Sequence, residues 1–247
     1  LAQGLTVGLP ARVAILRFPS GPQIVLGDSG GGLQSLSLSG QPLWNYSGGG
    51  EEIRGKDDAR KNRQTQLATE SHDGSVVVLE KKKKKVWEAD QESLRRMRAF
   101  DFNSDGNSEI LTGGEFGAFV VYSAADGSQL YTQSMGQAVS EIREVELNGD
   151  PSSREFVVGG KDGGVWAFSI QGGAVNQMWT GSLSDKVTEI SGIDVDGDGT
   201  EEAVLGDDSG TVAVFTGDGS RNNLGNHSTG ITRIDVGRLN GERYVVI

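Results

Sequence analysis

Five stretches of this sequence share one pattern, in which a short apolar run ends in glycine and a second apolar run follows. The five copies read QIVLGDSGGGLQSL, TQLATESHDGSVVVL, EILTGGEFGAFVVY, EFVVGGKDGGVWAF and EAVLGDDSGTVAVF. The glycines that they share are Gly31, Gly74, Gly117, Gly163 and Gly210, which are 43, 43, 46 and 47 residues apart. A nearly constant period restricts the chain to architectures that repeat one structural unit.

Each copy has the features of a β-hairpin. Apolar residues alternate along both runs, as in strands with a buried face, and the shared glycine suits a tight turn that needs a positive φ angle. A further apolar run precedes each hairpin. In four units a run with a large aromatic follows the hairpin, at Trp44, Trp87, Tyr131 and Trp179. Four strands in about 45 residues match one blade of a β-propeller, and we interpret the aromatics as packing between blades rather than as a sugar-binding ring.

The repeat therefore predicts an all-β fold, a β-propeller with five full blades and part of a sixth. The predicted blades cover about residues 1–50, 51–90, 91–133, 134–181 and 182–227, with the partial blade at 228–247. We expect a single propeller domain over residues 1–247, with six or seven blades when complete. Because no strands precede the first blade to close the ring, we expect a longer polypeptide, or another chain, to supply the missing strands.

Composition excludes several kinds of site. The chain has no cysteine, which removes thiol nucleophiles and cysteine-based zinc or iron–sulfur sites. His72 and His227 are its two histidines, and neither lies in a nucleophile motif. The formal net charge of −11 argues against nucleic acid as a partner and favours proteins, cations or neutral sugars. No apolar run is long enough to span a membrane, so membrane association would need a segment outside this sequence.

An acidic loop in the fifth unit has the pattern of a calcium site. In Asp194-Val-Asp-Gly-Asp-Gly-Thr-Glu-Glu202, acidic side chains fall at positions one, three, five and nine. Alternate residues of a tight loop point inward, and Ca²⁺ binds roughly six to eight oxygens. The candidate ligands are Asp194, Asp196, Asp198, the carbonyl of Thr200, and Glu202.

The third unit repeats this pattern as Asp101-Phe-Asn-Ser-Asp-Gly-Asn-Ser-Glu109. Its candidate ligands are Asp101, Asn103, Asp105, the carbonyl of Asn107, and Glu109. Both loops begin twelve residues before the first hairpin glycine of their unit, Gly113 or Gly206, and so occupy equivalent places in their blades. The alternative is a pair of ordinary turns, because Asp, Asn and Gly are favoured in turns that bind no ion.

At these residues the sequence resembles the FG-GAP or VCBS-type calcium-binding propeller repeats of integrin α subunits and bacterial surface proteins. The resemblance covers the five units and implies structural Ca²⁺ rather than catalytic metal. The fourth unit departs from the motif, with Glu146, Asn148, Asp150, an inserted Pro151 and no clear acid at position nine, so we expect no metal there. The rhythm DGSVVVL…VW of the second unit is similar to PQQ-type repeats, which serve in scaffolds and in enzymes.

Other signals are weaker. Lys81 to Lys85 would form a hairpin tip that contacts phosphate, anionic lipid or an acidic protein, but a solvated turn is the simpler interpretation. Paired acids for glycoside hydrolysis can form across blades and leave no local signature, so the sequence leaves that possibility open.

We therefore expect a non-catalytic, calcium-stabilised propeller that acts as a protein-interaction or scaffold module of a larger protein or complex. Its partners would be proteins or other domains of the same chain. The resemblance favours an extracellular, cell-surface or periplasmic location, and a cytoplasmic one stays open. The alternatives are a propeller glycosidase, lyase or quinoprotein-like enzyme with a site at the central channel, and an intracellular trafficking-coat propeller.

Overall fold

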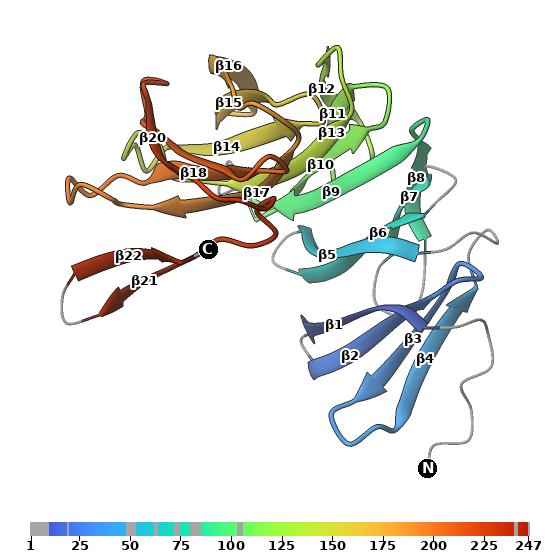
Figure 1. Cartoon of the computed structure of the whole chain (residues 1–247). Coiled ribbons are helices and arrows are strands. Elements are labelled where there is room, and N and C mark those ends of the chain that lie inside the picture. Colours follow the sequence, from blue (N-terminus) through green and yellow to red (C-terminus); the bar gives the residue numbers. More distant parts are fainter. Residues whose placement is uncertain are drawn as a thin grey trace. The chain divides into compact units, whose positions relative to one another are not determined.

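The computed structural model describes residues 10–18, 20–47, 53–61, 64–71, 75–79, 85–102, 106–239 and 242–246. Every regular element among these residues is a β-strand (Figure 1). The strands form five four-stranded sheets and one two-stranded sheet, and all strands that pair within them are neighbours in sequence. This arrangement confirms the predicted all-β propeller class, with one sheet for each predicted blade.

The first three sheets contain β1 to β12. The first sheet has β1 (Pro10–Phe18), β2 (Gly21–Asp28), β3 (Gly32–Ser37) and β4 (Pro42–Ser47). The second has β5 (Ile53–Lys61), β6 (Gln64–Ser71), β7 (Ser75–Leu79) and β8 (Lys85–Asp90). The third has β9 (Leu94–Phe100), β10 (Glu109–Gly114), β11 (Ala118–Ser123) and β12 (Gln129–Ser134).

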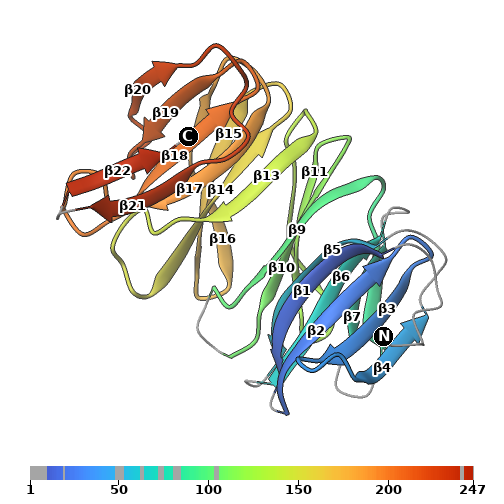
Figure 2. The ribbon, with the colours of Figure 1, turned by 60° about the horizontal axis from the view of Figure 1, so that its bottom comes forward.

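The remaining sheets contain β13 to β22. The fourth sheet has β13 (Val139–Glu144), β14 (Ser153–Gly160), β15 (Gly164–Gln171) and β16 (Ala174–Ser182). The fifth has β17 (Val187–Ile193), β18 (Glu202–Asp207), β19 (Thr211–Phe215) and β20 (Arg221–Asn226) (Figure 2). The two-stranded sheet has β21 (Asp235–Leu239) and β22 (Glu242–Val246).

The strands fall into two compact units. One comprises Leu1–Gly114 and Val120–Gln129, and the other comprises Glu115–Phe119 and Leu130–Ile247. That residues 1–247 form a single propeller domain stays a prediction.

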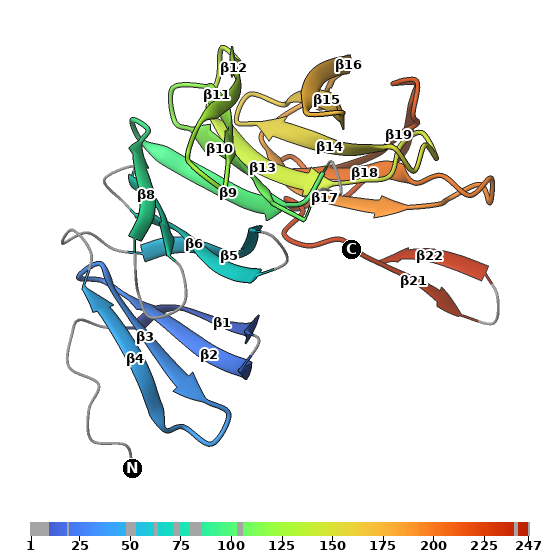
Figure 3. The same cartoon turned by 180° about the vertical axis from the view of Figure 1, so that it is seen from behind.

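The core of the second unit lies between the faces of its sheets (Figure 3). Val157, Val165 and Ala167 of the fourth sheet pack against Ala203 and Leu205 of the fifth, and all five are fully buried. Because side chains alternate across a strand, each central strand buries one set of aliphatic side chains on each face. The first unit uses the same packing, with Leu16, Val25 and Leu33 of the first sheet against Val77 and Leu79 of the second.

Two of the predicted aromatics lie at the outer edge of this core. Trp87 and Trp179 are each 9% exposed, which confirms their interpretation as packing residues. The Trp87 indole N–H donates to the Ala124 carbonyl at 2.8 Å, and the Trp179 indole N–H donates to the Gly217 carbonyl at 3.1 Å. Each acceptor belongs to the next blade, in the turn between its third and fourth strands. These tryptophans therefore contribute apolar packing and a hydrogen bond at one contact.

A glycine of the same turn lies against each indole ring. Gly219 has a φ of +84°, and a Cβ built on it would lie 2.8 Å from Cγ of Trp179. Gly127 has a φ of +77°, and a Cβ built on it would lie 2.8 Å from Cδ2 of Trp87. Glycine is required for two reasons. The backbone is left-handed at this position, and any side chain would collide with the indole ring.

We predict that Gly219→Ala destabilises the protein more than Gly173→Ala, measured by chemical denaturation. Gly173 has a φ of +85° but nothing within 4 Å of its would-be Cβ, so its substitution reports the backbone strain alone. That strain costs about 1–2 kcal/mol. Contact with Trp179 should add roughly 1–3 kcal/mol in the Gly219 variant. Equal losses in the two variants would contradict the close contact with the indole.

Candidate metal centre

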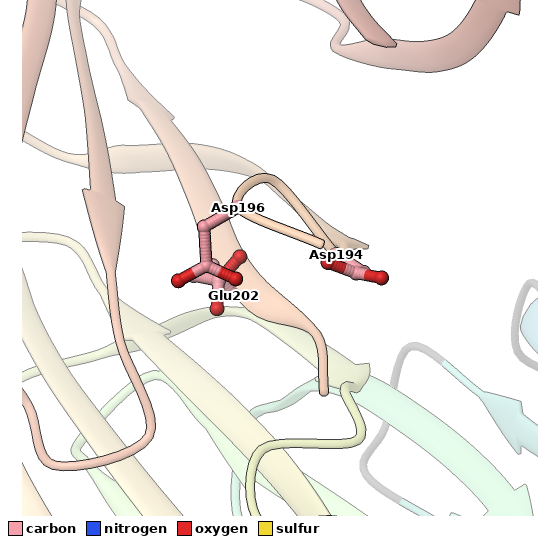
Figure 4. Close-up of side chains that lie close together, drawn as sticks. All are labelled: Asp194, Asp196 and Glu202. Atoms are coloured by element: carbon pink, nitrogen blue, oxygen red, sulfur yellow. The ribbon is translucent and has the colours of Figure 1, made fainter. Parts of the chain in front are cut away.

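The acidic loop of the fifth blade connects β17 to β18. Ile193 pairs with Glu202 at the base of the loop, so residues 194–201 project beyond the sheet. Figure 4 shows Asp194, Asp196 and Glu202, each of which offers a carboxylate oxygen that lies within 4.8 Å of the other two. Three of the five predicted ligands are therefore brought together as expected.

Hydrogen bonds inside the loop hold the other predicted ligands. The Asp198 Oδ1 accepts from the backbone N–H of Thr200 at 2.7 Å and from its hydroxyl at 2.6 Å, so Asp198 lies outside the three-carboxylate group. These two bonds lower the pKa of Asp198. Gly197 N–H donates to Asp194 Oδ1 at 2.6 Å, and Asp198 N–H donates to Asp196 Oδ1 at 3.1 Å. Backbone N–H groups of the loop therefore orient the carboxylates of its three aspartates.

Glu202 differs from the aspartates because it is buried, with 4% of its surface exposed. Its Oε2 accepts the backbone N–H of Val195 at 2.6 Å. Burial is the largest influence on the pKa of Glu202 and raises it. The hydrogen bond from the Val195 N–H lowers this pKa by less, and the charges of Asp196, Asp198 and Asp194 raise it. A bound cation would offset this repulsion, because it places positive charge among oxygens that now face one another.

The loop of the third blade, between β9 and β10, shares this arrangement. Phe102 N–H donates to Glu109 Oε2 at 2.9 Å, which is the counterpart of the bond from Val195 to Glu202. Gly106 N–H donates to Asp101 Oδ2 at 3.1 Å, while the buried Oδ1 of Asp101 has no hydrogen-bond partner among the residues that the structure describes. Such an oxygen is the kind of group that a cation satisfies. Asn103 and Asp105 lie outside the described residues, and the Asn107 carbonyl stays a predicted ligand.

The fourth blade contains a glutamate that the sequence analysis missed. Glu155 is 1% exposed, and its Oε2 accepts the backbone N–H of Leu147 at 3.1 Å, as Glu109 and Glu202 do in their blades. The inserted residue places this glutamate at position ten of the loop, so a search for an acid at position nine did not find it. Counting backward from the hairpin glycine finds it, since each of the three glutamates lies four residues before Gly113, Gly159 or Gly206.

The fourth loop supplies donors of its own to Glu155. The Glu155 Oε1 accepts from Asn148 Nδ2 at 2.9 Å and from Ser153 Oγ at 2.5 Å. Arg154 Nη1 lies 3.1 Å from Glu146 Oε2 and forms an ion pair with it, whereas the buried Oε1 of Glu146 has no hydrogen-bond partner among the described residues. That the fourth loop binds no metal stays a prediction.

A cavity of about 280 Å³ adjoins the fourth loop. Its described lining consists of Glu144, Val145, Glu146, Arg154, Glu155 and Glu201. Burial raises the pKa of Glu144 and of Glu155. Glu201 Oε2 accepts the backbone N–H of Glu146 at 3.1 Å. Glu155 and Glu201 each accept a bond from the backbone of the fourth loop and so help to hold that loop in place.

The other predicted surface signals are only partly described. Lys85 lies 2.5 Å from Glu88 in an exposed ion pair, whereas Lys81 to Lys84 and His72 lie outside the described residues. His227 is exposed, and its backbone N–H donates to the Gly210 carbonyl at 2.8 Å. None of the described residues forms a helix with the length and apolar character to cross a bilayer.

Solved structures resemble this chain in fold, although no protein-family model and no curated protein matches its sequence. The Saccharomyces cerevisiae protein Sqt1 is 16% identical with a TM-score of 0.72, over 89% of this chain and 63% of Sqt1. The computationally designed protein Ika8 is 19% identical with a TM-score of 0.70, over 94% of this chain and 69% of its own. A chain of the mitotic checkpoint complex is 14% identical with a TM-score of 0.66, over 94% of this chain and 72% of its own.

These similarities define the class of the protein, a propeller-type repeat fold. At such identities they concern the fold alone, and the chain spans 63% of the length of Sqt1. No family model confirms the resemblance of the five units to FG-GAP or VCBS repeats, which stays a prediction.

We predict that Glu202→Gln raises the melting temperature of the calcium-free protein near neutral pH. The pKa of Glu202 is raised in the folded state, so its ionisation opposes folding above that pKa and the benefit of the amide should disappear as the pH falls. Thermal melting between about pH 7 and pH 4 in a chelating buffer measures the difference.

Asp207→Asn is the matched control, because Asp207 is fully buried in the same sheet. Burial alone would raise the pKa of Asp207, but hydrogen bonds from Ser209, Thr211 and Ser184 outweigh it and lower the pKa. Ionised Asp207 therefore stabilises the fold at neutral pH, and that stability is lost as the pH falls through its folded pKa. The asparagine variant should melt below wild type near neutral pH. The same sign in both variants would contradict the electrostatic difference between the two carboxylates.

Proposed function

We propose that this chain is a non-catalytic propeller that serves as a protein-interaction or scaffold module, with structural Ca²⁺ in the loops of its third and fifth blades. The observation that carries the metal is the convergence of carboxylate oxygens of Asp194, Asp196 and Glu202 to within 4.8 Å of one another. Asp101 Oδ1, which has no hydrogen-bond partner among the described residues, supports a second site in the third blade.

The role of the ion would be to hold a loop in place. Each loop is anchored at one end by a buried glutamate that accepts a backbone N–H, and in the fifth blade the tip carries the exposed Asp196 and Asp198, whose charges repel one another. Ca²⁺ would fix the tip relative to the sheet, and a rigid loop at the end of a blade can present side chains to a partner at a lower entropic cost.

A binding role is supported by the kind of proteins that share the fold. One structural neighbour is a chain of the mitotic checkpoint complex, which is an assembly of proteins. The function of a propeller depends on its loops rather than on the fold, so this supports only the general role. We further propose an extracellular, cell-surface or periplasmic location, where free Ca²⁺ is high enough to fill loops of modest affinity.

The first test is calcium titration followed by thermal melting of wild type and Asp196→Ala. Binding to the native state should raise the melting temperature of wild type with increasing Ca²⁺, and the variant should lose most of that rise because one of three converging carboxylates is gone. The rise should also fade as the pH drops towards the pKa of Glu202, because protonation competes with the ion.

Asp218→Ala is the matched control for this titration. Asp218 is an exposed turn aspartate of the same blade that accepts a bond from Ser220 N–H at 2.9 Å but belongs to no acidic group among the described residues. It should respond to Ca²⁺ like wild type. If neither wild type nor Asp218→Ala responds, the calcium proposal for the fifth blade is wrong.

The interaction role is tested separately, by affinity capture with immobilised wild type in Ca²⁺ and in chelator, followed by mass spectrometry. We expect a protein that is retained in Ca²⁺, released by chelation and not retained by Asp196→Ala. Turnover of a glycoside by the purified chain would instead favour the enzyme alternative.

A further inference from the structure

Charge is divided unevenly between the two units. The first unit, Leu1–Gly114 and Val120–Gln129, contains 15 basic and 15 acidic residues. The second unit, Glu115–Phe119 and Leu130–Ile247, contains the other 8 of the 23 basic residues and the other 19 of the 34 acidic residues. The formal net charge of −11 therefore belongs entirely to the second unit. Charge asymmetry of this kind indicates that the two units suit ligands of different charge.

Most of the positive charge of the first unit lies on the first strands of its blades. β1 carries two arginines, β5 carries four basic and two acidic residues, and β9 carries three arginines. Nine of the 15 basic residues thus lie on three strands, with a net charge of +7. The corresponding strands of the second unit, β13, β17 and β21, carry two basic and four acidic residues. The positive charge is therefore particular to the first unit and is not a general property of first strands.

The three basic strands lie next to one another. β1 contacts β5, and β5 contacts β9, so the first strands of successive blades form a row (Figure 1). Each of them has between six and nine residues more than a turn would need, and at about 3.3 Å per residue each is roughly 25 Å long. We call the basic residues of these three strands the basic strip.

The arginines of β9 are accessible to solvent. Arg95 is exposed, and Arg96 and Arg98 are partly exposed, whereas Met97 between them is buried. Arg96 Nη1 donates to the Arg95 carbonyl at 3.0 Å, and Arg98 Nη1 donates to the Met97 carbonyl at 2.9 Å. Both acceptors are uncharged, so these two bonds do not neutralise the guanidinium groups. The strip therefore presents positive charge at β9.

The composition of the strip indicates the chemistry of its ligand. Seven of its nine residues are arginines, and a guanidinium pairs through two parallel hydrogen bonds with a carboxylate or a phosphate. Because the charges are spread over three strands, a ligand with several anionic groups along a flexible backbone matches them better than one small anion does. A long nucleic acid would also meet the charge of −11 on the same chain. A short peptide avoids that repulsion, because charges more than about 8 Å away are screened at physiological salt.

We propose that the basic strip binds an extended acidic segment, rich in aspartate and glutamate, of a partner protein. The proposal rests on the interaction role proposed above and names the chemistry of the partner. It does not depend on Ca²⁺ in the acidic loops, so the two can be tested apart.

The test is fluorescence anisotropy of a labelled peptide of about ten glutamates, titrated with the full chain in a chelating buffer. The chelator removes Ca²⁺, which could otherwise bridge the peptide to the acidic loops. We expect saturable binding that weakens as the salt concentration rises from about 0.05 M to about 0.5 M. A labelled thymidine oligonucleotide of the same length should bind more weakly, and tighter binding of the oligonucleotide would overturn the proposal.

An Arg95→Gln and Arg98→Gln double variant locates the binding. Loss of two guanidinium groups should weaken peptide binding by about tenfold or more. The Arg95→Lys and Arg98→Lys double variant keeps the charge and should recover part of that loss, which a merely misfolded protein would not do. Lys82→Gln with Lys83→Gln is the matched control, because it removes the same charge from the first unit outside the strip and should bind like wild type.

Three results would overturn the proposal: wild type that shows no saturable binding, lysine and glutamine variants of Arg95 and Arg98 that both bind like wild type, or a Lys82 and Lys83 variant that loses as much affinity as the glutamine variant of the strip. A partner obtained by affinity capture that binds the Arg95→Gln and Arg98→Gln variant as tightly as wild type would leave the interaction role standing and would overturn the assignment to the strip.

Discussion

The burial of one sheet face against the next is the interaction on which the structure depends. A four-stranded sheet of about 45 residues has too little interior to be stable alone, so each blade relies on the aliphatic side chains of its neighbour. Val157, Val165 and Ala167 against Ala203 and Leu205 show this packing in its most complete form. Everything at the ends of the strands, including the acidic loops, is positioned by it, because the strands fix where each loop begins and ends.

The fold was predictable from the sequence because its signals are local and repeated. A hairpin glycine and alternating aliphatic residues recur in all five units and a late aromatic recurs in four, and each signal needs only a few neighbouring residues to be recognised. The site was predictable only in part. Asp194, Asp196 and Glu202 converge as the motif indicates, but Asp198 bonds to Thr200, and no spacing rule anticipates that choice.

Glu155 shows why fixed spacing failed where register would have succeeded. Glu155 lies within β14, where strand pairing fixes its position. The loop before β14 tolerates an added residue. Loop length is free to vary because the loop projects into solvent, but a strand residue cannot move by one position without changing faces. The surrounding donors, Asn148 and Ser153, depend on three-dimensional proximity and leave no pattern in a single sequence.

The tryptophan contacts have a consequence for how the repeats cooperate. Trp87 and Trp179 each reach forward along the chain, to a turn in the following blade, and each lies against a glycine there. The turn between the third and fourth strands of a blade is thus held by the tryptophan of the blade before it. The contacts between repeats are therefore directional along the chain. Loosening that starts in one repeat should spread more readily towards the C-terminus than towards the N-terminus, because the turn that its tryptophan releases belongs to the next repeat.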